Sequence, residues 1–212
     1  MTKQTRSENT RLHLVRSAAE LFDRNGFAGA TLEDVSRAAG VTKGAFYFHF
    51  SSKDELGGAI QEEARALLHA AVFRAGSQRL AVQSLVDLTH ELAGWLEHEP
   101  VVRASFRTAR EHGHRGKPFL DFHTDWLATV ETLLTRARGT GELREEVDVD
   151  HAATLVLAVS TGVEMLWWAG IRRGSIRESL AGMWRLALPG LVFPHRLSEI
   201  DPGGSIRGPQ SR

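Results

Sequence analysis

Apolar residues recur every three or four positions along most of the chain. Over residues 9–24, for example, Leu12, Val15, Ala19 and Phe22 fall on one face. This spacing matches the 3.6-residue period of an α-helix. No stretch shows the alternation or the Asn-Gly turns that are typical of β-hairpins. The pattern therefore predicts an all-α protein.

Glycines and prolines divide this pattern into successive helices. Asn25-Gly26 and Gly40 are typical helix ends, and residues 113–118, 139–141 and 170–174 are typical short connections. After the first helix we expect others over residues 31–40, 42–48, 51–73, 78–98, 101–111, 118–138, 150–170 and 176–192. Residues 197–212 are rich in Gly, Pro and Ser, which predicts a mobile tail.

Composition restricts the class of protein. The chain is 42% hydrophobic and 25% charged, as globular proteins are, and it has no cysteine. Disulfides, thiol nucleophiles and cysteine-based metal sites are therefore excluded. No segment approaches the roughly 18 apolar residues of a membrane helix, and the polar N-terminus lacks the apolar stretch of a signal peptide. We expect a cytoplasmic protein with no membrane partner.

The chain has no net charge overall, but its first quarter has a small basic excess. Lys+Arg and Asp+Glu both number 26, but residues 1–53 carry eight basic and five acidic side chains. An architectural nucleoid protein would need a much stronger basic charge. Any DNA binding should therefore be specific, depending on helix N-termini and hydroxyls more than on bulk electrostatics, with weak nonspecific affinity.

Residues 31–50 have the pattern of two short helices joined at a glycine. Val35, Ala39, Val41 and Phe46 occupy the positions that must be apolar to hold two such helices at a steep angle. In this helix-turn-helix arrangement the second helix enters the major groove with its N-terminus first. Its early residues must therefore be small or able to form hydrogen bonds.

Eight residues of this segment suit contact with DNA. Helix N-terminal amides, hydroxyls and cations are natural partners of phosphates. Taken singly, such residues also serve as helix caps or core aromatics, but together on one short helix they favour a groove. We assign phosphate contacts to Thr31, Thr42, Tyr47, His49 and Lys53, a guanine edge to Lys43, close backbone approach to Gly44, and a thymine methyl to Ala45.

Three stretches of this region closely resemble the DNA-binding domain of TetR-type transcriptional repressors: Thr31–Val35, Ala39–Phe50 and Lys53–Leu56. The resemblance covers about residues 9–56. It implies an all-α homodimer and agrees with the contacts assigned above, except that Ala45 is not among the family positions. The implied organisation is a three-helix DNA-binding domain at 1–56, a helical bundle for ligand binding and dimerisation at 57–196, and the tail at 197–212.

A further resemblance concerns the ligand. Gly44–Phe50, Arg103–Arg107, Pro118-Phe119 and Thr124–Trp126 resemble the γ-butyrolactone receptors of filamentous actinomycetes. In that subfamily a Trp on the seventh helix faces the ligand, and Trp126 is the matching position. Related pseudo-receptors share this outline and sense antibiotics or other signals. Two inducer classes therefore stay open, γ-butyrolactone-like and antibiotic-like.

The helix expected over residues 118–138 has one apolar face. Such a face is commonly plain core, but ligand pockets are mainly apolar and often lie between the helices of a bundle. Few ionisable residues occur on these faces, which favours a neutral or weakly polar ligand. The expected ligand site comprises Trp126, Phe122, Val130, Thr161, Leu88 and Phe106.

The last two predicted helices hold more apolar surface than one chain can bury. Trp and Met are favoured in interface cores, so we expect a two-fold homodimer. Its predicted interface comprises Leu155, Val159, Trp167, Trp168, Met183 and Trp184. Glu164 lies among them and is interpreted as a solvated edge, with a pocket anchor or a dimer contact as alternatives. A dimer places two recognition helices roughly 34 Å apart, which implies a near-palindromic operator.

Other chemistry finds little support. His112, His114 and His123 lack a second ligand pair, and no GxSxG, Walker A or GxGxxG motif occurs. The sequence therefore predicts no metal, no cofactor and no catalysis, with a helical-bundle enzyme as a distant alternative. The favoured function is a repressor that binds double-stranded DNA as a dimer and is released by a small molecule.

Overall fold

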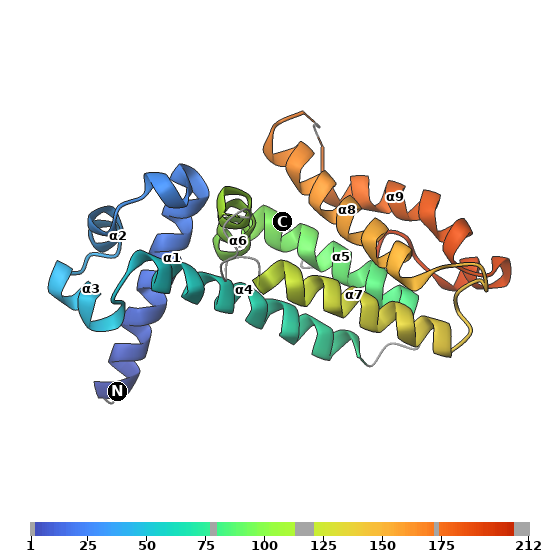
Figure 1. The fold of residues 1–212 in the computed structure, drawn as a ribbon, viewed down its shortest axis with the longest axis horizontal. Coiled ribbons are helices and arrows are strands. Elements are labelled where there is room, and N and C mark those ends of the chain that lie inside the picture. Colours follow the sequence, from blue (N-terminus) through green and yellow to red (C-terminus); the bar gives the residue numbers. More distant parts are fainter. Residues whose placement is uncertain (1–2, 77–79, 113–120, 172–173, 206–212) are drawn as a thin grey trace. The chain divides into compact units, whose positions relative to one another are not determined.

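A computed structural model describes residues 3–76, 80–112, 121–171 and 174–205 (Figure 1). These residues are mainly helical, and the only β-type pairing among them is an isolated bridge between Leu143 and Val192. The all-α prediction is confirmed. Contacts group the chain into two compact units, Met1–Leu67 with Glu99–His123, and Leu68–His98 with Thr124–Arg212.

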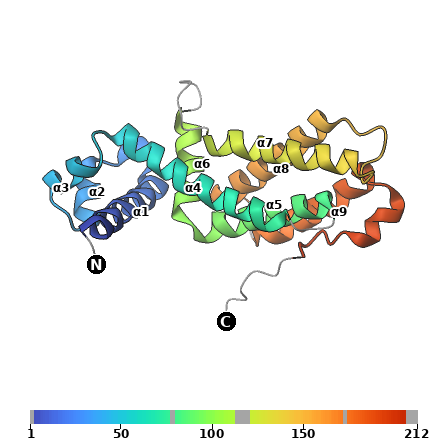
Figure 2. The same ribbon diagram turned by 90° about the horizontal axis from the view of Figure 1, so that it is seen from below.

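The first unit contains the predicted helix-turn-helix. It comprises α1 (Lys3–Gly29), α2 (Leu32–Ala38), α3 (Lys43–His49), the first part of α4 (Lys53–Ala75) and α6 (Pro100–His112). In both views α6 lies beside the C-terminal end of α1 (Figures 1 and 2). The core between these helices is aromatic and aliphatic, with Phe22, Val35, Phe46, Phe50 and Leu56 at most 1% exposed.

Helix α1 is longer than the sequence predicts. The expected break at Asn25-Gly26 is confirmed, because the backbone leaves helical geometry at Gly26 (φ 78°, ψ 163°); helical geometry then resumes as far as Gly29. A positive φ of this kind favours glycine. The additional length of α1 comes from its earlier start at Lys3 and from the short helical segment after Gly26.

The second unit is a bundle of long helices. It holds α5 (Ala81–His98), most of α7 (Asp121–Gly139), α8 (Val149–Trp168) and α9 (Ile176–Leu191), followed by the 3₁₀ helix η2 (Pro194–Glu199). Helix α9 packs against both α5 and α8 (Figure 2). Leu85, Leu88 and Trp126 lie in its core, each at most 1% exposed.

A buried carboxylate fixes the start of α5. Glu142, only 2% exposed, accepts hydrogen bonds from the backbone N–H groups of Ala81 (3.0 Å) and Val82 (2.9 Å). The hydroxyl of Thr140 donates to the same carboxylate at 2.7 Å. Glu142 thus satisfies helix N-terminal donors that have no partner within the helix. It lies just after a Gly-rich connection, where the sequence analysis placed no structural role.

The predicted mobile tail has defined contacts as far as Ser205. The Asp201 N–H donates to Gln83 Oε1 at 2.7 Å, and the Ser205 N–H donates to Asp87 Oδ1 at 2.7 Å. His90 Nε2 lies 2.9 Å from the Pro202 carbonyl oxygen. These contacts correct the expectation for residues 197–205, because polar groups on one face of α5 hold the segment. Residues 206–212 lie outside the described part of the chain.

Helix α8 is more apolar than expected. By length and composition alone it could cross a membrane, as the core helix of a soluble protein also can. The expectation that no segment approaches such a span is therefore wrong. Only 28% of its most apolar 18-residue stretch is buried within the chain. An apolar face is thus left exposed.

Candidate functional site

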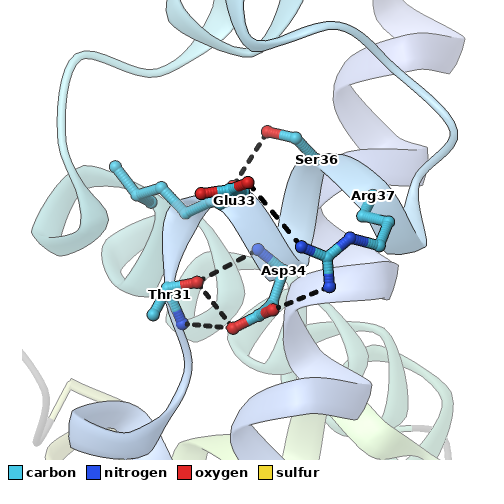
Figure 3. Close-up of polar contacts among 6 residues, drawn as sticks. Thr31, Glu33, Asp34, Ser36 and Arg37 are labelled. Atoms are coloured by element: carbon cyan, nitrogen blue, oxygen red, sulfur yellow. Dashed lines mark hydrogen bonds and ion pairs between the residues drawn. The ribbon is translucent and has the colours of Figure 1, made fainter.

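A capping box starts α2 at Thr31 (Figure 3). The Thr31 hydroxyl accepts a hydrogen bond from the Asp34 N–H at 3.1 Å and donates to Asp34 Oδ2 at 2.5 Å. The Asp34 carboxylate also accepts from the Thr31 N–H at 3.3 Å. The hydroxyl proton that was assigned to a phosphate is therefore already donated within the protein. Exposed Thr31 acts first as the α2 N-cap.

The charges beside this cap are locally compensated. Hydrogen bonds from Thr31, helped by the nearby Arg37 guanidinium, hold the pKa of Asp34 below its usual value. Arg37 reaches Asp34 at 3.3 Å and Glu33 at 3.7 Å (Figure 3). Both partners are solvent-exposed, so these ion pairs contribute little to stability. The arrangement keeps one cation close to the two acidic side chains.

The recognition helix α3 exposes its early residues. Thr42 is its N-cap and accepts from the Ala45 N–H at 3.1 Å. Lys43 and Gly44 are exposed, and Tyr47 is 49% exposed. Positions i, i+1 and i+4 of a helix lie within one half of its circumference. The structure thus places Lys43, Gly44 and Tyr47 on the same solvent-facing side.

Two other predicted contact residues of α3 are less exposed. Ala45 and His49 are half-buried, and His49 packs edge-on against Phe48 with ring centroids 5.1 Å apart. Phe48 itself is 78% exposed. Phe48 had no predicted role, although an aromatic residue four positions after Gly44 shares its side of the helix.

Gly44 has no packing reason to be a glycine. It lies inside α3 with no positive φ, and the atom nearest to a Cβ built there is Thr42 Oγ1 at 4.0 Å. Glycine inside a helix costs roughly 1 kcal/mol relative to alanine. The described contacts therefore do not require glycine here, whereas close approach of another molecule would.

Lys53, at the start of α4, is held against the protein. Its ammonium donates to the Ala28 carbonyl oxygen at 3.4 Å and lies 4.6 Å from the centre of the Phe27 ring. Partial burial lowers the pKa of Lys53, against the opposing effects of Glu111 and Asp54. An ammonium has three donors, so a carbonyl partner still leaves donors for a phosphate.

The predicted ligand residues fall in both units. In the first, Phe106 and Phe122 are at most 2% exposed and pack with ring centroids 5.6 Å apart. His123 lies 4.4 Å from Phe106 by the same measure. Burial, with a smaller effect of Arg110, lowers the pKa of His123 to about 4. The imidazole is therefore neutral at physiological pH.

Trp126, in the second unit, is the most distinctive of these residues. Its side chain is 1% exposed, and its indole Nε1 has no hydrogen-bond partner among the described residues. Tryptophan can only donate at this atom, and a buried unsatisfied donor costs about 1–3 kcal/mol. Leu88 and Val130 are buried in the same unit, and Thr161 is half-buried.

The predicted dimer residues are divided between surface and core. Leu155, Trp168 and Met183 are 44%, 52% and 37% exposed, and Val159 and Trp167 are half-buried. Leu186, at 79%, is the most exposed of this group but was not among the six predicted interface residues. Apolar hollows of about 200 and 460 Å³ open along the same two helices.

The predictions for Trp184 and Glu164 are wrong. Trp184 is only 5% exposed, and its Nε1–H donates to Thr89 Oγ1 at 2.8 Å, so it belongs to the protomer core. Glu164 is 3% exposed, not a solvated edge. The side chains of His112 and His114 lie outside the described residues, and no group of three metal-ligating side chains occurs among those described.

Comparison with known proteins supports this interpretation. Residues 14–60 match the model of the family described as bacterial regulatory proteins, tetR family. The A-factor receptor protein of Streptomyces griseus is 33% identical over 97% of this chain and 72% of its own length. The transcriptional regulator UidR of Escherichia coli K12 is 36% identical over 76% of this chain and 82% of its own length.

Solved structures agree with these relatives. An ArpA-like γ-butyrolactone receptor superposes with a TM-score of 0.79 at 28% identity, over 93% of this chain and 96% of that chain. CprB from Streptomyces coelicolor, in complex with its operator sequence, superposes with a TM-score of 0.75 at 31% identity, over 92% and 94%. The chain therefore belongs to the tetR family of bacterial regulatory proteins and is a transcriptional regulator that resembles the A-factor receptor.

Proposed function

We propose that the ligand-free protein binds a near-palindromic operator as a homodimer and that a small, mostly apolar molecule releases it. The inducer we favour is a γ-butyrolactone. The observation that carries this choice is the buried Nε1–H of Trp126, which has no partner among the described residues. The relatives named as γ-butyrolactone and A-factor receptors support the same ligand class.

DNA recognition in this proposal uses the exposed side of α3 and the cap residues around it. Lys43, Gly44 and Ala45 would read bases, whereas Thr42, Tyr47, His49 and Lys53 would contact phosphates. Thr31 would contribute through the N-terminus of α2, because its hydroxyl is engaged by Asp34. An operator-binding protein acts at the chromosome, so we place it in the cytoplasm, on the nucleoid when bound.

The homodimer would form through the exposed apolar face of α8 and α9. Leu155, Met183 and Leu186 are exposed there, and large exposed apolar patches typically mark interaction sites. A membrane would be an alternative cover for α8, but a second copy of the chain is favoured because two copies present two recognition helices to one operator. We infer no catalytic role, because the relatives compared are regulators.

Ligand recognition would satisfy the Trp126 donor. A lactone carbonyl oxygen accepts a hydrogen bond, and the apolar side chains of Leu88 and Val130, buried in the same unit as Trp126, suit an alkyl chain. Release of DNA requires that the ligand bind the released state more tightly. A shift from 1:99 to 99:1 needs about 5.5 kcal/mol of differential affinity.

The test replaces Trp126 with Phe, which keeps an aromatic ring but removes the N–H. We expect operator affinity without ligand to be unchanged and the γ-butyrolactone concentration for half-release to rise about tenfold, as for one lost hydrogen bond. Trp184→Phe is the matched control. It removes an indole N–H that Thr89 already satisfies, so the half-release concentration should not change.

The outcomes distinguish the two inducer classes. Release by a γ-butyrolactone at the same concentration in wild type and Trp126→Phe would contradict the assigned site. Release of wild type by an antibiotic and not by any γ-butyrolactone would favour the antibiotic-sensing alternative. Fluorescence anisotropy of a labelled operator, selected from random duplexes with the purified protein, gives both readings.

A further inference from the structure

Two arginines of α6 hold the C-terminal end of α1. Arg103 Nε donates to the Asp23 carboxylate at 2.7 Å. Arg107 Nη1 donates to the backbone carbonyl oxygens of Asp23 at 2.5 Å and Arg24 at 2.9 Å. The last carbonyl groups of a helix lack partners within it, and cationic side chains can cap them. These arginines are one helical turn apart, so a single face of α6 supplies both.

Glu111 continues this face by one more turn and contacts the chain just after the kink. Its Oε2 accepts from the Ala28 N–H at 3.3 Å, and its Oε1 accepts from Arg107 Nε at 3.2 Å. A Cβ at Gly26 would overlap Glu111 Oε1 and lie 3.1 Å from Arg107. Glycine at the kink therefore permits this close approach of α6, in addition to its positive φ.

Ala28 links this contact to a predicted DNA anchor. Its N–H donates to Glu111 of α6, while its carbonyl oxygen accepts from Lys53 Nζ at 3.4 Å. Lys53 also lies over the ring of the preceding residue, Phe27, at 4.6 Å. The long Lys53 side chain is thus ordered on a short backbone segment that α6 itself holds.

We propose that Arg107 and Glu111 are positioning residues for operator binding, which act by fixing residues 23–28 and, through them, the ammonium of Lys53. This inference rests on the proposed function. Ordering a lysine before it meets a phosphate reduces the conformational entropy lost on binding. Neither Arg107 nor Glu111 needs to touch DNA for this effect.

The same helix carries a predicted ligand residue. Phe106 directly precedes Arg107 and packs on Phe122. Because α6 is one rigid element, a ligand that displaces Phe106 also displaces the Arg107 and Glu111 contacts. Lys53 then loses its support, and operator affinity falls. The ligand would then bind the released state more tightly than the operator-bound state, because the two states differ in the contacts of α6 with residues 23–28.

The test measures operator affinity and its salt dependence for Arg107→Met and Glu111→Ala, each alone and combined with Lys53→Ala. We expect each single variant to weaken binding about tenfold, within the usual range of coupling between sites. Because each acts through one phosphate contact, the slope of log affinity against log salt should fall by about one. In the Lys53→Ala background the further loss should be about twofold or less.

Glu62→Gln is the matched control, since it breaks the Glu62–Arg65 ion pair on α4 and should leave affinity unchanged. A merely structural role would give losses that add to that of Lys53→Ala, with an unchanged salt slope, and this would overturn the inference. So would wild-type affinity in both variants, or in Lys53→Ala. If Arg107→Met does not fold, the Glu111→Ala cycle decides. Failure of wild type to bind any operator would instead overturn the proposed function.

Discussion

At the scale of single residues, a substitution of Gly44 should affect stability and operator binding in opposite directions. Its neighbours leave room for a methyl group, with the nearest atom at 4.0 Å, and alanine favours helices more than glycine does. We expect Gly44→Ala to raise the free energy of unfolding by about 0.5–1 kcal/mol. We also expect it to weaken operator binding at least about tenfold, because the methyl group blocks approach to the bases.

Thermal unfolding and operator titration measure both effects of Gly44→Ala. Gly58→Ala is a matched control, because Gly58 lies within α4 and a Cβ there also meets nothing within 4 Å. It should stabilise the helix without weakening operator binding. Unchanged operator affinity in Gly44→Ala would show that no DNA group approaches this position.

His123 predicts a pH dependence of stability. Its pKa is lowered from 6.5 to about 4 in the folded protein, so the unfolded chain takes up a proton first as pH falls. Stability should therefore decrease below about pH 6.5 and level off below about pH 4. Between pH 7.5 and pH 5 the contribution of His123 amounts to a loss of about 2 kcal/mol.

Denaturant unfolding of His123→Gln at these two pH values tests the assignment. The variant should lose about 2 kcal/mol less than wild type on acidification. His98→Gln, which removes a histidine with a 79% exposed side chain, should behave as wild type does. Equal pH dependence in wild type and His123→Gln would contradict a buried neutral imidazole.

The sequence located the caps and the core positions of the helix-turn-helix because these depend on local order. Caps at Thr31 and Thr42 and apolar positions at Val35 and Phe46 follow from short-range rules. Short-range rules do not show whether Trp184 faces the protomer core or a partner, because an apolar helix face has the same sequence pattern in both cases. Its hydrogen bond to Thr89 joins residues 95 positions apart.

At the scale of elements, Glu142 fixes the start of α5. It accepts from two backbone donors at the α5 N-terminus while 2% exposed. Glu142→Ala leaves both donors buried without this partner, at about 1–3 kcal/mol each. We expect the free energy of unfolding to fall by about 3 kcal/mol in denaturant titrations. Glu145→Ala, at an exposed position of the same connection, should change it little.

Periodicity located the helices well but missed how their ends are held. The tail resembled a disordered segment in composition, yet Gln83, Asp87 and His90 on α5 supply partners for it. The spacing of these three polar residues, at positions i, i+4 and i+7 of an otherwise apolar helix, could have indicated a polar contact on one face of α5. The partners themselves lie more than 100 residues away, where no local rule applies.

At the scale of the whole molecule, we propose that dimerisation depends on the exposed face of α8 and α9. Leu186 is 79% exposed there, and Leu186→Glu would bury an unpaired charge in the proposed interface, at a cost of about 3 kcal/mol or more. Sedimentation should show a monomer at concentrations where wild type is dimeric. Phe73→Glu, at an 88% exposed position on α4, should remain dimeric.

The balanced charge of the chain bears on its binding to nonspecific DNA. With 26 basic and 26 acidic side chains, the protein lacks the basic excess that drives nonspecific binding. We therefore expect affinity to come from a few aligned contacts made twice, once by each protomer of the proposed dimer. A near-palindromic site should therefore bind far more tightly than a single half-site.

The most direct test is an anisotropy titration of the wild-type protein with its selected operator, at moderate salt, with and without a γ-butyrolactone. We predict binding of two protomers to the palindromic duplex, weak binding to a scrambled duplex, and release when the lactone is added. Equal affinity for operator and scrambled DNA, or an operator complex that no small molecule releases, would contradict a ligand-responsive repressor.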